Sequence, residues 1–181
     1  MEKLVRTEKN RIRGESGFTL IEILIVVILL GILATIIIPQ VSVSSDDAKL
    51  NALKTNLGNM RSSIELYYYQ HSNAYPGAKS ETDGTATSSD GAAATAFAEQ
   101  LLKFTSSAGV VAVSGDSTYQ YGPYVRSELP TNPFNSLNTV VCDYDETDIT
   151  KKTSSGASAG WKFYPKTGIL VSGDGGAHDT L

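Results

Sequence analysis

The chain has 181 residues, of which 41% are hydrophobic, and a formal net charge of −4. This length suits one small domain with an additional segment, and the acidic balance gives no support to general binding of nucleic acid or of an anionic membrane surface. Cys142 is the only cysteine, which excludes a disulfide bond within the chain.

An apolar run at residues 18–38 dominates the N-terminal part and contains one charged side chain, Glu22. A helix of this length, at about 1.5 Å per residue, would span the roughly 30 Å hydrocarbon core of a bilayer. A carboxylate in such a helix costs about 2–3 kcal/mol, so Glu22 indicates a specific partner. Residues 1–17 are rich in lysine and arginine, and positive charge beside a membrane span tends to stay cytoplasmic. The sequence thus predicts one membrane span, with the rest of the chain on the outer side.

An ordinary secretory signal is a poorer interpretation of this region. Its apolar part is about 7–15 residues long and ends at a small-residue cleavage site. The apolar run here is longer, and residues 41–45, which follow Pro39, lack an A-x-A pattern. A cut after Pro39 is therefore disfavoured, and we interpret residues 18–39 as a helix that stays in the mature chain.

The sequence Gly17-Phe-Thr-Leu-Ile-Glu22, followed by an apolar run with Gly31 inside it and Pro39 at its end, resembles the class III signal of the type IV pilin superfamily. That superfamily includes the type IV pilins and the pseudopilins of type II secretion. The resemblance implies that residues 1–17 are a basic leader, which a prepilin peptidase cleaves off between Gly17 and Phe18. The same enzyme also methylates the new amino group of Phe18. It further implies that Glu22 of one subunit reaches the amino group of the next subunit in a helical filament.

The resemblance also implies partners and a location. The partners are other copies of the chain in a homo-oligomeric filament, the prepilin peptidase and methyltransferase, an inner-membrane assembly platform with its ATPase, and minor pseudopilins or pilins. The chain would cross the bacterial inner membrane once, with its N-terminus in the cytoplasm and its head in the periplasm or outside the cell. No nucleic-acid partner is expected.

Three functions are compared. The first is a structural subunit of a type II secretion filament, which is favoured because the chain lacks the C-terminal disulfide of many type IV pilins. The second is a type IV pilin for adhesion, motility or DNA uptake. The third is a monomeric membrane-anchored binding module, which would share the anchor but would not need Glu22.

Gly31 and Pro39 are weak points of the first helical half, because glycine costs about 1 kcal/mol relative to alanine and proline removes a backbone hydrogen bond. Membrane helices tolerate both residues, and the alternative is local unwinding during filament packing. Residues 41–45 are poor helix formers, so the sequence leaves a break there open. The resemblance instead implies one long helix.

Residues 40–72 are predicted to be the amphipathic second half of this helix. Apolar side chains recur at spacings of three and four, which places them on one face. These residues are Leu50, Leu53, Leu57, Met60, Ile64 and Tyr67. A helix packed under a sheet explains this stripe better than a coiled-coil seam, because regular flanking charges are missing. The helix should end near residues 69–72, before Tyr75-Pro76-Gly77.

Residues 73–181 are predicted to form a globular head. Residues 77–95 consist almost entirely of Ser, Thr, Ala, Gly and Asp, which bury little apolar surface, so we predict a flexible exposed loop. A short amphipathic helix should follow at 96–104 and a short strand at 110–113. Residues 119–135 should form an irregular, proline-rich loop held by aromatic side chains.

Three further strands are predicted at residues 139–142, 161–164 and 169–172. The last two are joined by Pro165-Lys166-Thr167-Gly168, a favourable turn sequence. A small antiparallel sheet of these strands over the long helix gives an α+β, pilin-like fold. Trp161, Phe163 and Leu170 would then be core residues.

Candidate catalytic groups are few. His71 and His178 are the only histidines, lie far apart in the sequence, and indicate neither a triad nor a zinc site with Cys142. We therefore predict no enzymatic activity and no catalytic residue. The GDGG sequence at residues 173–176 lacks the lysine and the helix of a phosphate-binding loop and indicates a turn.

Carboxylates gather in two late segments, and calcium prefers such hard oxygen ligands. The first candidates lie between two predicted strands and are Asp143, Asp145 and Asp148. The second candidates are Asp174 and Asp179, because the resemblance to major pseudopilins implies calcium in a C-terminal loop. A solvated acidic loop is the alternative in both places. Apart from such a structural calcium ion, no cofactor is predicted.

Overall fold

A computed structural model describes residues 17–154, 158–176 and 178–181, and it gives residues 36–44 as backbone only. The chain divides into two compact units, residues 1–44 and 45–181. Each unit is described by itself. The predicted leader, apart from Gly17, lies outside the described residues.

Helix α1, Leu20–Gln70, is the longest element and contributes to both units. Its backbone is helical through residues 41–45, so the single helix implied by the resemblance is confirmed there. The end at Gln70 agrees with the predicted end. Ser72 and Asn73 follow with positive φ angles of 55° and 61°, a conformation that stops a right-handed helix.

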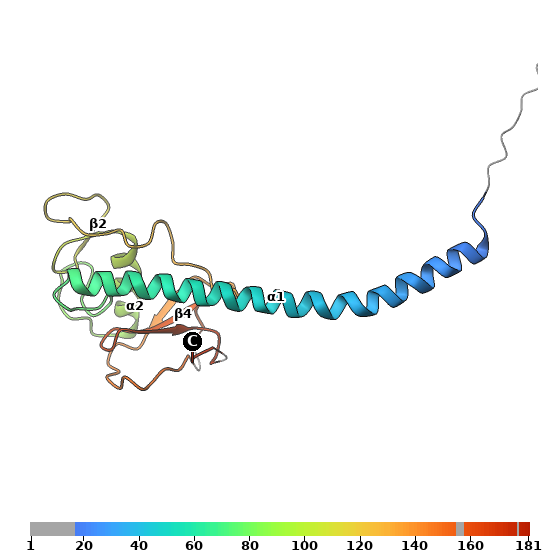
Figure 1. Cartoon of the computed structure of the whole chain (residues 1–181). Coiled ribbons are helices and arrows are strands. Elements are labelled where there is room, and N and C mark those ends of the chain that lie inside the picture. The colour runs from blue at the N-terminus through green and yellow to red at the C-terminus, as the bar shows by residue number, and fades with distance from the viewer. Residues whose placement is uncertain (1–16, 155–157, 177) are drawn as a thin grey trace, which may run out of the picture. The chain divides into compact units, whose positions relative to one another are not determined.

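The apolar stripe of α1 forms one side of the core of the second unit, as predicted. Its five C-terminal members are each at most 1% exposed, whereas Leu50 is only partly buried. The stripe packs with Ala93, Phe97, Leu101, Leu129, Cys142, Trp161, Phe163 and Leu170 in one cluster. Each fully buried large apolar side chain contributes about 1.5–3 kcal/mol. In Figure 1, α2 and β4 lie beside this part of α1.

Helix α2, Asp90–Leu102, corrects the prediction of a flexible loop over residues 77–95. It begins six residues before the predicted helix, with Ser89 as its N-cap. Its alanines suggested too little apolar surface for folding. Instead, Ala93 and Ala96 are fully buried, because their small side chains let α2 approach the rest of the core closely.

The residues before α2 are ordered as well. Gly77 is buried, and its N–H donates to Gln100 Oε1 at 2.9 Å. The amide nitrogen of Gln100 donates to the backbone oxygens of Lys79 and Gly109, each at 2.9 Å. One buried glutamine side chain of α2 thus ties down this segment, which composition alone did not reveal.

Five short strands form two sheets. They are β1 (Phe104–Thr105), β2 (Val111–Ala112), β3 (Val140–Cys142), β4 (Trp161–Tyr164) and β5 (Ile169–Ser172). The strands β2 to β5 were predicted, and β1, which pairs antiparallel with β2, was not. The C-terminal sheet has the order β3-β4-β5.

The direction of one strand pair corrects the predicted antiparallel sheet. β4 and β5 are antiparallel, but β3 and β4 are parallel. A parallel pair requires a long crossover connection, and residues 143–160 provide it. The turn between β4 and β5 is confirmed: Gly168 has a φ of 73°, and a Cβ there would lie 2.3 Å from the ring of Tyr75. The predicted core residues of these strands are at most 1% exposed.

Residues 119–135 form the irregular loop that was predicted, and polar as well as aromatic side chains hold it. The ring of Tyr124 lies 5.5 Å from that of Tyr67 in α1. Asn132 is fully buried and donates to the backbone oxygen of Gly160 at 2.9 Å. The loop is thereby fixed to both the long helix and the sheet.

The predicted membrane span covers residues 18–39, of which the last four have no described side chain. Among the described residues, no helix combines the length and the hydropathy required to cross a membrane.

Candidate functional site

The residues around the start of α1 form the first candidate site, since the resemblance assigns processing and assembly to them. Their apolar side chains are largely exposed. Phe18 is 83% and Leu20 86% exposed, and the large apolar residues from Ile21 to Leu33 are 50–62% exposed. So large a continuous apolar surface requires a cover of lipid or of other chains.

Glu22 is held at the start of its own helix by Thr19. Glu22 Oε2 accepts hydrogen bonds from Thr19 N at 2.8 Å and from Thr19 Oγ1 at 2.9 Å. In return, Glu22 N donates to Thr19 Oγ1 at 3.3 Å. This is a capping box, in which the residue before the helix and the third helical residue satisfy each other's N–H groups. Sequence reasoning missed Thr19, although T-x-x-E before an apolar run is the signature of the box.

The other predicted assembly residues make no close contact within the chain. Gly17 and Gly31 are exposed, and a Cβ at either position would meet no atom within 4 Å. Within the described part of the chain, neither position therefore requires glycine for lack of space. Pro39 lies within α1, but its side chain is outside the described residues.

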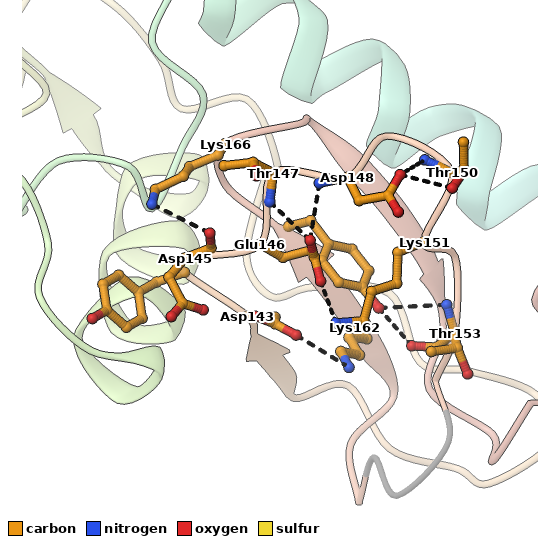
Figure 2. A network of polar contacts seen from close by, with 12 residues as sticks. Asp143, Asp145, Glu146, Thr147, Asp148, Thr150, Lys151, Thr153, Lys162 and Lys166 are labelled. Carbon is orange, nitrogen blue, oxygen red and sulfur yellow. Dashed lines mark hydrogen bonds and ion pairs between the residues drawn. The ribbon is translucent and has the colours of Figure 1, made fainter.

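The first acidic segment lies between β3 and β4, and Figure 2 shows its polar contacts. Asp143 Oδ2 lies 3.8 Å from Lys162 Nζ. Asp145 accepts a hydrogen bond on its backbone oxygen from Lys166 Nζ, at 3.3 Å. Asp148 Oδ1 accepts from N and Oγ1 of the residue two positions on, at 2.8 and 2.7 Å. The carboxylates of Asp143 and Asp148 thus have different partners, and Asp145 is contacted through its backbone oxygen.

The second acidic segment, residues 173–181, holds Asp174 and Asp179. Asp174 Oδ2 contacts His178 Nδ1, and the side chain of Asp174 is 5% exposed. Its other oxygen, Oδ1, is buried and has no hydrogen-bond partner among the described residues. Asp179 Oδ1 accepts from Ser154 N at 3.0 Å and from Ser154 Oγ at 2.7 Å. An unpaired buried carboxylate oxygen fits a cation, so this segment suits calcium better than the first one.

No group of three or more His, Cys, Asp and Glu residues suited to hold a metal ion occurs within the described part of the chain. The five predicted calcium ligands are thus not brought together as one set. Calcium binding stays a prediction, and Asp174 is the residue whose environment supports it.

His71 has a structural environment. Its Nδ1 lies 2.8 Å from Tyr67 O and its Nε2 lies 2.9 Å from Thr105 Oγ1. Because a carbonyl oxygen only accepts hydrogen bonds, Nδ1 carries the proton and Nε2 accepts from the Thr105 hydroxyl. The ring stacks on Tyr67 at 3.7 Å, and burial lowers the pKa of His71. Cys142 is also buried, which raises the pKa of its thiol and makes it a poor nucleophile.

Comparison with known proteins finds a family motif in the N-terminal segment. Residues 12–38 match the prokaryotic N-terminal methylation motif. The chain is 42% identical over 64 residues to a type II secretion system core protein G of Pseudomonas aeruginosa. The aligned segment covers 35% of this chain and 44% of the relative. The protein of the same name from Vibrio cholerae is 30% identical over 67 residues, with 37% and 45% covered.

A third relative of the same name, from Klebsiella michiganensis, is 30% identical over 66 residues, which is 36% of this chain and 46% of the relative. The chain thus spans less than half the length of the curated relatives it matches. No solved structure matches the chain with comparable significance.

Proposed function

We propose that this chain, which carries the prepilin signal of the type IV pilin superfamily and is related to core protein G of type II secretion, is a pseudopilin: a structural, non-enzymatic subunit of a membrane-anchored helical filament. The filament would serve protein secretion. Its core would consist of the apolar part of α1 from many copies, and the heads, residues 45–181, would lie outside it.

One observation carries this proposal: a helix segment whose large apolar side chains are all at least half exposed, with a single carboxylate at its start. The exposed side chains from Phe18 to Leu33 need a cover, which lipid provides before assembly and neighbouring helices provide afterwards. An anchor alone would need no acid. Glu22 is costly in an apolar layer unless it is paired, so its presence supports an assembly role.

Processing would supply the partner of Glu22. Cleavage after Gly17 leaves a positive amino group on Phe18, four residues before the carboxylate. Unlike charges in a low-dielectric layer attract strongly, and each is costly when left alone. In the uncleaved chain the carboxylate accepts from Thr19. We propose that in the filament it also pairs with the amino group of the neighbouring subunit and thereby sets the axial register.

The partners and the location belong to the same proposal. The N-terminus would be cytoplasmic before cleavage, the chain would cross the inner membrane once, and the head would face the periplasm. A prepilin peptidase with methyltransferase activity, an assembly platform with its ATPase, and minor pseudopilins would act on the chain. Mass spectrometry of protein from its native membrane should find a mature chain that starts at methylated Phe18. An intact leader in assembled filaments would contradict the proposal.

The assembly role is tested with variants that separate the charge of Glu22 from its capping role. Glu22→Gln keeps an oxygen that accepts from Thr19 N but removes the charge. We expect normal insertion and cleavage of this variant and of Glu22→Val, with loss of filaments in a strain that lacks the native subunit. Glu22→Asp should restore filaments in part, since the charge is kept on a shorter side chain.

Thr35→Val is the matched control, because it also removes a polar group from the exposed helix but no charge. It should be cleaved and assembled like the wild type. Filament yields at the wild-type level for Glu22→Gln and Glu22→Val, with normal cleavage, would refute the charge pairing. Loss of cleavage in both would instead assign Glu22 to recognition by the peptidase.

Two other functions are distinguished by simple observations. A type IV pilin for adhesion, motility or DNA uptake would be encoded beside a retraction ATPase, whereas a secretion pseudopilin would be encoded beside a secretin and an assembly ATPase alone. A monomeric anchored module would remain a monomer in membranes and would tolerate Glu22→Val without loss of function.

We also propose that a structural calcium ion binds the C-terminal segment, with Asp174 and Asp179 as ligands. The support is the buried Oδ1 of Asp174, which accepts no hydrogen bond from the described residues. The ion would neutralise this oxygen and link residues 173–181 to the rest of the head.

A further inference from the structure

We infer that the loop of residues 143–153 is closed by three lysine side chains, which take the electrostatic role that a divalent cation would otherwise have in a segment so rich in carboxylates. The inference concerns the head alone and does not depend on the proposed filament. It rests on how the loop is anchored, where its acids point and which cations face them.

Both ends of the loop are anchored on β4. At its start, Asp143 N donates to Phe163 O at 3.1 Å. At its end, the hydroxyl of Tyr164 donates to Thr153 O at 2.7 Å. The loop thus follows β3, and residues of β4 hold both of its ends. This confines its acids to a small region beside β4.

The lysines reach the loop from two directions. Lys162 and Lys166 project from β4 and from the turn after it, and contact the side chain of Asp143 and the backbone oxygen of Asp145. Their ammonium groups also lie over aromatic rings, 5.1 Å from the centroid of Tyr164 for Lys162 and 5.8 Å from that of Tyr144 for Lys166. Such cation–π contacts favour the positive charge where it lies.

The third lysine closes the loop from within. Lys151 Nζ contacts Glu146 Oε2. The other oxygen of Glu146 accepts from the backbone N–H groups of Thr147 and Asp148, each at 2.9 Å. The side chain of Glu146 is 14% exposed and that of Lys151 is 48% exposed, so solvent and salt still screen this pair in part.

These contacts leave little reason for a metal at this place. Calcium would require several carboxylates to turn toward one point, yet those of Asp143 and Glu146 here contact different lysines, and that of Asp148 accepts from Thr150 N and Oγ1 (Figure 2). Two of the four carboxylates of residues 143–148 therefore pair with an ammonium group, and the third lysine, Lys166, contacts a backbone oxygen. A divalent ion would have to displace these lysines before it could bind.

The test is hydrogen–deuterium exchange of the full chain in detergent, read on the peptide that covers residues 143–153. Lys151→Gln should speed exchange of the Thr147 and Asp148 N–H groups about three- to fivefold, as expected for loss of one partly shielded ion pair. Exchange in the wild type should be faster in high salt, because salt screens the pairs. In Asp174→Asn protein, which lacks a ligand of the proposed C-terminal calcium site, exchange should be the same with calcium chloride as with a chelator.

Lys152→Gln is the matched control, since Lys152 is adjacent and exposed and has no ion pair among the described residues. Its loop should exchange like that of the wild type. Two results would overturn the inference: slower exchange of this peptide in Asp174→Asn protein when calcium is added, or equal exchange rates in Lys151→Gln and Lys152→Gln.

Discussion

Acidification should destabilise the head through His71. The imidazole is 1% exposed, and each of its nitrogens has one hydrogen-bond partner. Burial is the main cause that holds the pKa of His71 below the ordinary 6.5, and the positive charge of Lys79 acts in the same direction. The other groups that face the ring are Tyr67, Tyr121 and Tyr124, which cannot neutralise an imidazolium.

The direction in which stability changes with pH follows from proton binding to the folded and unfolded chains. The unfolded chain takes up a proton on His71 near pH 6.5, whereas the folded chain does so only at lower pH. The stability contributed by neutral His71 is therefore complete well above pH 6.5, and it is lost as the pH falls from 6.5 toward the pKa of the folded state. The limiting slope is about 1.4 kcal/mol per pH unit, so a fall from about pH 7.5 to about pH 5.5 removes at most about 1.4 kcal/mol.

The measurement is urea unfolding of the full chain in detergent, followed by fluorescence of Trp161, the only tryptophan and a buried one. His71→Phe keeps a ring against Tyr67 but cannot titrate. It should lower stability at neutral pH, because Thr105 loses its acceptor, and it should lose less stability than the wild type on acidification. Leu50→Ala is the control, since it removes apolar contacts but no titratable group, and it should keep the wild-type pH dependence. Parallel pH profiles for the wild type and His71→Phe would refute the reasoning.

Three other perturbations test the core and the C-terminal segment. Leu57→Ala should cost about 2–5 kcal/mol of unfolding free energy by opening a cavity, and Leu50→Ala clearly less, because Leu50 is only partly buried; equal costs in urea unfolding would argue against the buried stripe. Asn132→Leu should cost about 1–3 kcal/mol, because the oxygen of Gly160 and the hydroxyl of Ser172 each lose the hydrogen bond that the Asn132 amide donates, and an unchanged melting temperature would show that these bonds are dispensable. Calcium at a hundredfold excess over its Kd should stabilise the wild type by about 2.7 kcal/mol and Asp174→Asn much less, and no shift at millimolar calcium would remove the metal from the C-terminal segment.

Features that depend on neighbours in the sequence were determined by the sequence alone. The spacing of the stripe from Leu53 to Tyr67 predicted the buried face of α1, because helical periodicity is a local property. The turn at Pro165–Gly168 and strands β3 to β5 followed from local preferences in the same way. The capping box of Thr19 and Glu22 is equally local and could have been predicted from T-x-x-E.

Only the tertiary structure decided features that join distant residues. The alanine-rich composition of α2 predicted too little apolar surface for an ordered segment. Its alanines are buried because other elements pack close to them, and composition does not encode such packing. The parallel pairing of β3 with β4 depends on the path of residues 143–160, and strand patterns carry no direction. The acids near Asp143 suggested a metal, whereas the lysines that face them come partly from β4 and the turn after it. Charge pairing between segments is set by the fold, so the sequence could show which charges exist but not which of them meet.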